Sequence, residues 1–365
     1  MEESKQSVFQ KIGDFIKKYF WCLAIGAAVL ALIFLFLPIL KYEIREAVYD
    51  SASNERLFKT DYVYAANIIW IFKCGGKLSY LMFATIGFIL VGIILIPFSK
   101  FNKDILVLSG IIFLLAVCMF FIMREVFLDE ENNVMKITPI VGVEYNSATQ
   151  YFYPYLHEVT LSWGANLAIF FCTLAFAFTT LSNQSSTTKQ IAEEGVLLAL
   201  AFVLNLVKIP VGSTGGSINF QMLPLMIIAL RHGPAHGFIF GGIVYGLLTC
   251  LTDGYGFACY PFDYLIGFGS IAIMGFFRKL IFSETQDGYN LKGLIFIFIA
   301  GALSTFVRYV GSNVSSIVVY DYSLKAALAY NAFYIPLSGL IATVAFMLLY
   351  APLIRLNKLY PVKSI

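Results

Sequence analysis

The chain is 365 residues long, with 59% hydrophobic residues, 13% charged residues and a net charge of +3. Soluble globular domains carry about one quarter charged residues, so this composition excludes a protein surrounded mainly by water. The small net charge gives no sign of nucleic-acid binding. The cysteines form no CxxC pair and no helical carboxylate joins His232 and His236, so we expect neither a disulfide framework nor a metal site.

The first half contains apolar runs that are long enough to cross a bilayer, which takes about 20 residues of helix. Lysines precede the first run and should stay in the cytoplasm, so the N-terminus is predicted to lie inside. This run is too long for a signal peptide and has no convincing cleavage site. The predicted spans are Tyr19 to Leu40, Leu78 to Phe98, Ile105 to Met123 and Leu161 to Leu181.

The segments between these spans carry weaker signals. The aromatic stretch Tyr62 to Phe72 is too short to cross and is predicted to be an interfacial or packed helix. A small extended element is expected around Met135 to Val143 in an acidic outer segment. The polar stretch Ser182 to Lys189 is typical of a linker, so the predicted domains are residues 1–187 and 188–365.

The second half contains more closely spaced apolar segments, and the short one that begins at Gln221 is expected to start within the membrane beneath a re-entrant loop. Basic residues gather in alternate loops, which predicts both termini in the cytoplasm of a multi-pass plasma-membrane protein. The expected fold is all-α, with about ten transmembrane helices, four N-terminal and six in a C-terminal bundle. The six C-terminal segments are Glu194 to Ile209, Gln221 to Leu230, Pro234 to Leu251, Tyr260 to Leu280, Leu291 to Val310 and Ala326 to Leu353.

Polar residues interrupt the apolar helices of the second half near their predicted outer ends. Asp263, Arg308 and Asn331 are the strongest of these. A charge inside a membrane is costly, so it marks a candidate functional site. Two interpretations stay open: Asp263 and Arg308 form a structural pair, or Asp263 faces a cavity and meets a cationic or hydrogen-bond-donating ligand.

Tyrosines gather at the same level, among them Tyr264, Tyr320 and Tyr330. An aromatic belt at the membrane interface explains most of them. Tyr264 is adjacent to Asp263, however, and could stack on a flat heterocycle or enclose a cation. The pattern is typical of both a belt and a pocket.

The glycine-rich segment Val211 to Phe220 is not a phosphate loop, because it lacks the GKS or GKT ending and a preceding strand. We expect it to line or cover a cavity. The sequence contains no GxSxG, HExxH or paired intramembrane carboxylates, so nothing supports an enzyme. Gly195 and Ala199 stand four residues apart and give one helix a smooth face, which favours packing within the chain or docking onto a partner membrane subunit.

Residues 190–355 resemble the thiamine-specific substrate-capture (S) subunits of energy-coupling factor (ECF) vitamin transporters. The resemblance depends on the order of several short motifs, each weak alone, and on the count of six helices. The motifs are Gly215-Gly-Ser-Ile-Asn-Phe-Gln-Met-Leu-Pro224, Ala229-Leu-Arg-His-Gly-Pro-Ala-His-Gly237, Asp263-Tyr264, Arg308-Tyr309 followed by Ser315-Ser316, and Tyr330-Asn331 with Tyr334.

The resemblance implies a ligand cavity that opens outward. It also implies a coupling membrane subunit and two cytoplasmic ATPases as partners, so that ATP is used by the partners and this chain binds no cofactor. The acidic residue, its following tyrosine and the late asparagine of the family carry over to Asp263, Tyr264 and Asn331. Asn219 occupies the loop position where another acidic contact is expected.

The chain departs from the family where Ser312 replaces a histidine, Tyr320 replaces an aromatic that is usually Trp, and Ala326 replaces a tyrosine. The expected ligand is therefore thiamine, or a related vitamin or precursor. A membrane scaffold without a small-molecule ligand is the alternative, and the first half has no function that the sequence reveals. The predicted ligand contacts are Asp263, Tyr264, Asn331, Tyr320, Ser312, Asn219 and Tyr330.

Overall fold

The computed structural model describes residues 8–50, 55–74, 76–128, 153–181, 187–211, 216–255, 257–282, 290–320 and 322–360. The chain divides into two compact units, residues 1–182 and 183–365. Helices predominate in both units, as the apolar composition predicts.

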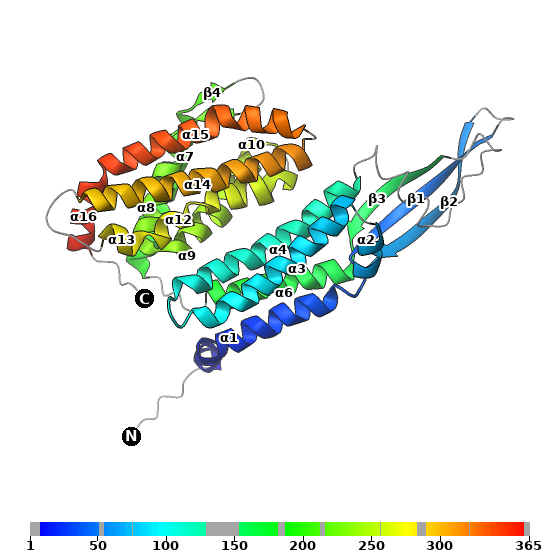
Figure 1. Ribbon diagram of the computed structural model, residues 1–365, viewed down its shortest axis with the longest axis horizontal. Helices are drawn as coiled ribbons and strands as arrows, with labels where there is room; N and C mark the ends of the chain where they lie inside the picture. The colour runs from blue at the N-terminus through cyan, green and yellow to red at the C-terminus, as the bar shows by residue number, and fades with distance from the viewer. Residues whose placement is uncertain are drawn as a thin grey trace. The chain divides into compact units, whose positions relative to one another are not determined.

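Helices of the N-terminal unit pack side by side, α3 on α4, α1 on α6 and α4 on α6 (Figure 1). A close approach between α3 and α4 depends on Gly92, because a Cβ atom there would lie 2.5 Å from the Phe113 ring. The elements are α1 (Val8–Phe34), α2 (Ile68–Cys74), α3 (Gly76–Phe98), α4 (Asp104–Leu128), α6 (Trp163–Phe176) and the π-helical turn η1 (Ala177–Leu181).

A three-stranded antiparallel sheet extends from one end of these helices and was not predicted from the sequence (Figure 1). Its strands are β1 (Leu40–Asp50), β2 (Glu55–Ala66) and β3 (Tyr153–Leu161), in the order β2-β1-β3. Tyr42 of β1 pairs with Tyr64 on one side and Val159 on the other.

Two predictions for this part of the chain can be compared with the sheet. The predicted helix from Tyr62 to Phe72 is wrong over its first part: β2 runs to Ala66, and only Ile68–Cys74 is helical. Tyrosine and valine favour strands, and pairing with β1 satisfies the backbone there. The extended element expected around Met135 to Val143 lies outside the described residues.

The C-terminal unit is a helical bundle in which α14 packs along α15, and α8 contacts α7, α12 and α15. Its long helices are α7 (Thr188–Leu206), α8 (Met222–His232), α14 (Leu291–Val318), α15 (Leu324–Leu348) and α16 (Tyr350–Leu359). One continuous helical segment consists of α9 (Pro234–Gly237), the π-helix η2 (Phe238–Tyr245) and α10 (Gly246–Asp253). The short elements are β4 (Ile209–Val211), β5 (Gly216–Ile218), η3 (Phe257–Cys259), the π-helix η4 (Tyr260–Ile266), α11 (Gly267–Gly269), α12 (Ala272–Phe276) and α13 (Arg278–Phe282).

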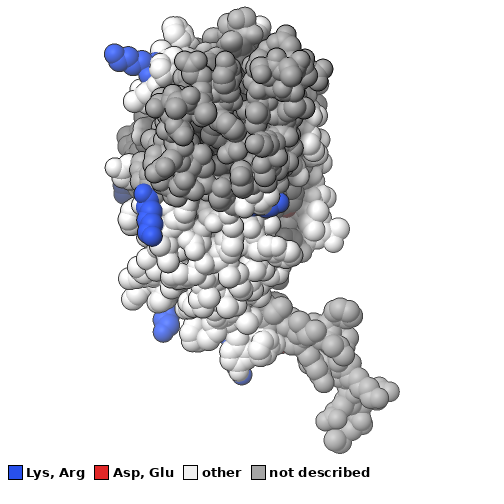
Figure 2. Space-filling model, turned by 90° about the vertical axis from the view of Figure 1, so that its right-hand side faces the viewer, with Lys and Arg blue, Asp and Glu red and all other residues white. Residues whose placement is uncertain are grey.

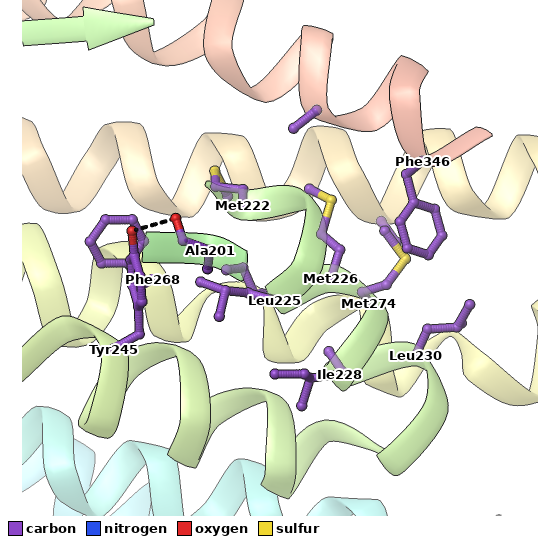
Figure 3. Close-up of a cluster of buried hydrophobic side chains, with 14 of the residues drawn as sticks. Ala201, Met222, Leu225, Met226, Ile228, Leu230, Tyr245, Phe268, Met274 and Phe346 are labelled. Atoms are coloured by element: carbon purple, nitrogen blue, oxygen red, sulfur yellow. Dashed lines mark hydrogen bonds between the residues drawn. The ribbon is translucent and has the colours of Figure 1, made fainter. Parts of the chain in front are cut away.

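Buried apolar side chains from α8, η2, α11, α12 and α15 form the core of this unit (Figure 3). The rings of Tyr245 and Phe268 meet edge to face, with centroids 4.9 Å apart. Gly242 lets two backbones touch, because a Cβ atom there would lie 2.6 Å from the Leu265 carbonyl oxygen. This packing holds η2 against η4 and α11, the elements that carry the polar residues described below.

Six helical segments among the described residues are long and apolar enough to cross a bilayer. They are Leu78–Phe98, Asp104–Arg124, Trp163–Thr180, Pro234–Asp253, Leu291–Val318 and Leu324–Leu348, and the apolar helices Lys18–Phe34 and Met222–His232 are shorter. On the face drawn in Figure 2, most of the described atoms belong to uncharged residues. Such a surface suits hydrocarbon better than water, so the chain is a multi-pass membrane protein.

Candidate functional site

A cavity of about 550 Å³ lies in the C-terminal unit. Residues from the end of α7, strand β5, α10, η4, α11, α14 and α15 line it. Its volume falls in the range of small-molecule sites, roughly 300 to 1,000 Å³. Two acidic and two basic residues reach it, together with hydroxyl groups, amides and tyrosines, so the lining is unusually polar for the interior of a membrane bundle.

The π-helix η4 supplies two neighbouring residues, Asp263 and Tyr264, to this cavity. Pro261 lies in its first turn, where the missing N–H costs nothing. Ser312 of α14 lines the same cavity. The Tyr264 hydroxyl donates a hydrogen bond of 3.1 Å to Oδ2 of Asp253, the last residue of α10.

Arg308 of α14 is buried in the wall of the cavity with 8% of its surface exposed. Its guanidinium lies over the Phe268 ring at 5.0 Å from the centroid, and one terminal N–H donates to the Met222 sulfur at 3.0 Å. Among the described residues, Nε of Arg308 has no hydrogen-bond partner. No ion pair joins Asp263 and Arg308 among the described residues, so the two residues line the cavity without a direct contact between their charged groups.

Asn331 of α15 joins two helices at the cavity wall and has 1% of its surface exposed. Its amide nitrogen lies within hydrogen-bonding distance of Asn313 Oδ1, Ser316 Oγ and the Ala327 carbonyl, at 3.2, 3.0 and 3.1 Å. Its amide oxygen accepts the Tyr334 hydroxyl at 3.0 Å. Its donors are therefore used within the protein, and only its oxygen has capacity left.

Aromatic residues cover the rest of the cavity. The backbone N–H of Gly216 donates to the Tyr330 hydroxyl, and this bond joins β5 to α15. The Tyr320 hydroxyl shares a hydrogen bond of 3.0 Å with the Cys259 thiol. Because Tyr320 is 41% exposed, its ring is accessible from the mouth of the cavity.

The structure brings together Asp263, Tyr264, Ser312, Tyr320, Tyr330 and Asn331 around this one cavity. Asn219 does not line it: its amide donates to Asn205 and Ser217 and accepts from the backbone of Gln221, because the chain turns there from β5 into α8. The roles of all the predicted residues as ligand contacts stay predictions. The sequence reasoning missed Lys208 and Asp253 as lining residues, although a carboxylate at the end of an apolar helix was a usable signal for Asp253.

A cluster of charged residues lies at the other end of α8. The Arg231 guanidinium makes a two-point ion pair with Glu193, and His232 Nε2 lies 3.5 Å from the same carboxylate. His236 Nδ1 lies 2.6 Å from a carboxylate oxygen of Glu194. The described residues contain no group of three metal-ligating side chains. Nearby on α7, Gly195 and Ala199 are exposed.

A polar cavity inside a bundle of membrane-length helices defines a class of protein, the membrane component that binds a small molecule for transport. A family model described as thiamine transporter protein matches residues 191–358. The thiamine transporter ThiT of Bacillus subtilis (strain 168) is 30% identical over an alignment of 196 residues, which covers 48% of this chain and 97% of that protein. The chain therefore belongs to the thiamine transporter family, and it is a transporter component and not an enzyme.

Two solved structures are also similar, each with 21% sequence identity. One is ThiT from Listeria monocytogenes, with a TM-score of 0.39, covering 45% of this chain and 94% of that one. The other is the S component of a bacterial ECF transporter, with a TM-score of 0.36, covering 47% of this chain and 99% of that one. The matches leave the other half of this chain without a counterpart in these proteins.

Proposed function

We propose that residues 183–365 form the substrate-binding subunit of an ECF-type importer, which captures thiamine or a related vitamin or precursor from the outer face of the plasma membrane. The observation that carries this proposal is the cavity, which gathers Asp263, Tyr264 and Arg308 inside the part of the chain that matches the family. The B. subtilis relative is named a thiamine transporter, which supports thiamine as the first ligand to test.

The lining gives each contact a proposed role. Asp263 neutralises a positive charge on the ligand, and the Tyr264 and Tyr320 rings stack on its heterocycle. Asn331 offers its amide oxygen, since its N–H groups are used by neighbouring residues. Ser312 is smaller than the histidine that the resemblance leads one to expect there. The cavity therefore also accommodates a ligand somewhat different in shape from thiamine.

Transport requires energy that this chain has no motif to supply. We propose that it assembles with a coupling membrane subunit and two cytoplasmic ATPases, which use the ATP, and that this chain binds no cofactor. The exposed Gly195 and Ala199 of α7 give the coupling subunit a smooth face for close helix packing.

The proposed topology has ten spans with both termini in the cytoplasm. Besides the six membrane-length segments, it uses the apolar part of α1, helices α7 and α8, and the broken segment from η4 to α13. The Arg231 cluster then lies on the cytoplasmic side and the cavity on the outer side, as the positive-inside rule favours.

Ligand-dependent stability tests the proposal. Full-length protein in detergent is heated with thiamine, its phosphates, its pyrimidine precursor, riboflavin or other vitamins. A ligand at a hundredfold excess over its Kd stabilises the protein by about 2.7 kcal/mol. We expect stabilisation by thiamine or its precursor, lost in Asp263→Asn and kept in Asp14→Asn, which changes an exposed carboxylate of α1. Failure of every vitamin to stabilise the wild type would favour the scaffold without a ligand.

A further inference from the structure

Asp253 is a second carboxylate that lines the cavity, and its position in its own helix does not explain why an acidic residue is present there. It is the last residue of α10, followed by Gly254 in the left-handed region (φ 75°). A carboxylate at a helix C-terminus faces the negative end of the helix dipole, which disfavours it. The hydrogen bond that Asp253 makes instead is accepted from the Tyr264 hydroxyl, at 3.1 Å.

This bond decides what Tyr264 offers to a ligand. A tyrosine hydroxyl has one hydrogen to donate, and Tyr264 gives it to Asp253, which leaves the oxygen lone pairs. Tyr264 is 6% exposed, so few positions remain for its hydroxyl to turn to. The Asp263 carboxylate and the Asn331 amide oxygen are also acceptors. Arg308 supplies a donor instead, since its buried Nε–H has no partner in the described part of the chain and the residue lines the cavity.

We infer that Asp253 is a positioning residue, which holds the Tyr264 hydroxyl as an acceptor toward the cavity and so selects a heteroaromatic ligand bearing an amino group over the same ligand bearing a carbonyl. This inference rests on the proposed function. An amino group pairs with the acceptors of Tyr264 and Asp263, whereas a carbonyl oxygen leaves buried acceptors facing one another without a proton. Sites that hydrogen-bond a ligand donor reject analogues lacking it because their own groups are left unpaired.

Two ligands that differ at one position test the selection. Thiamine carries an amino group on its pyrimidine, and oxythiamine carries a carbonyl there. The Kd of each is measured by calorimetry on the full chain in detergent. The variants are Asp253→Ala, Asp253→Asn and Tyr264→Phe. Leu251→Ala is the control, a truncation two residues earlier in α10 of a side chain that is 67% exposed and does not line the cavity.

We expect the wild type to bind thiamine more tightly than oxythiamine, so that the ratio of the oxythiamine Kd to the thiamine Kd is well above one. Asp253→Ala and Tyr264→Phe each reduce this ratio by about tenfold, the effect of one hydrogen bond to a charged or oriented group. Asp253→Asn keeps the ratio, because its amide oxygen still accepts the Tyr264 hydroxyl. Leu251→Ala also keeps it. A merely structural role of Asp253 would weaken both ligands equally and leave the ratio unchanged.

The remaining outcomes separate the inference from the proposed function. A wild type that binds thiamine, with an unchanged ratio in Asp253→Ala, overturns the inference and leaves the function standing. A lowered ratio in Tyr264→Phe alone means that Tyr264 acts without Asp253, which also overturns it. If Asp253→Ala binds neither ligand, Asp253→Asn decides, and loss of the ratio there contradicts the inference. A wild type that binds neither ligand contradicts both.

Discussion

The backbone N–H of Gly216 donates a hydrogen bond of 2.8 Å to the hydroxyl of Tyr330, a residue far along the chain on α15. Ser338 of the same helix donates to the Ser217 carbonyl at 3.3 Å. Gly216 has no room for a side chain, because a Cβ atom would lie 2.8 Å from the Tyr334 ring. Strand β5 is therefore seated on α15 at the cavity, and we expect it to restrict the exit of a ligand.

Tyr330→Phe should weaken ligand binding by about fivefold, mainly through faster dissociation, since it removes one hydrogen bond of about 1 kcal/mol that holds β5 in place. Stopped-flow or surface-plasmon measurement of koff with the stabilising ligand checks this. Tyr309→Phe serves as the control, because the Tyr309 hydroxyl donates to the Leu328 carbonyl outside the cavity. An equal effect of both changes would show that β5 does not limit dissociation.

Asn331→Ala should destabilise the ligand-free protein by about 1 to 3 kcal/mol, because Asn313, Ser316 and Tyr334 lose their partner in a buried site. Thermal unfolding without ligand measures this. Asn166→Ala removes an exposed amide from α6 and should change little. If Asn331→Ala unfolds like the wild type and loses only ligand affinity, its network is dispensable and Asn331 serves the ligand alone.

Glu193→Gln should lower the free energy of unfolding by about 2 kcal/mol or more, since it leaves the Arg231 guanidinium, 2% exposed, without a counter-charge. The double variant Glu193→Gln with Arg231→Met should recover part of the loss, because it removes the orphaned charge as well. Chemical denaturation in detergent compares the wild type, Glu193→Gln, Arg231→Met and the double variant. Additive losses in the double variant would mean that the two side chains do not act as a pair.

Gly195→Leu should leave thermal unfolding of the isolated protein unchanged and prevent co-purification with the coupling membrane subunit. Among the described residues, nothing lies within 4 Å of a Cβ atom at position 195, so a larger side chain has open space there. Gly26→Leu is matched to it, as an exposed helical glycine of α1 with equally open surroundings. Normal assembly of Gly195→Leu would place the docking surface elsewhere.

Apolar run length predicts helices such as α3, α4 and α14 well, because lipid leaves the backbone few other ways to satisfy its hydrogen bonds. The sheet β2-β1-β3 was not predictable in the same way. Strand β1 pairs with β3 more than a hundred residues later, for example Leu40 with Leu161, and a local pattern does not specify such a distant partner. The segment that begins at Tyr62 was predicted as a helix for this reason, although strand β2 runs to Ala66.

The candidate site was partly predictable, because a charged or amide side chain within an apolar helix is costly enough to be visible in sequence. Asp263 and Asn331 stand out in this way, and both line the cavity. Asn219 does not line the cavity, and its loop position in the sequence says nothing of the direction of its side chain, which donates to Asn205. Asp253 was not among the predicted site residues, and only the fold shows the Tyr264 hydroxyl beside it.

The π-helical winding of η4 has a consequence for how such sites are recognised. In an α-helix, with 3.6 residues per turn, neighbouring residues point about 100° apart, so a cavity on one face receives every third or fourth residue. A π-helix places more residues in each turn and brings neighbours closer in direction. Asp263 and Tyr264 reach one cavity although they are consecutive. A search that expects helical spacing would assign them to different faces, and an acid followed directly by a tyrosine is the pattern to look for instead.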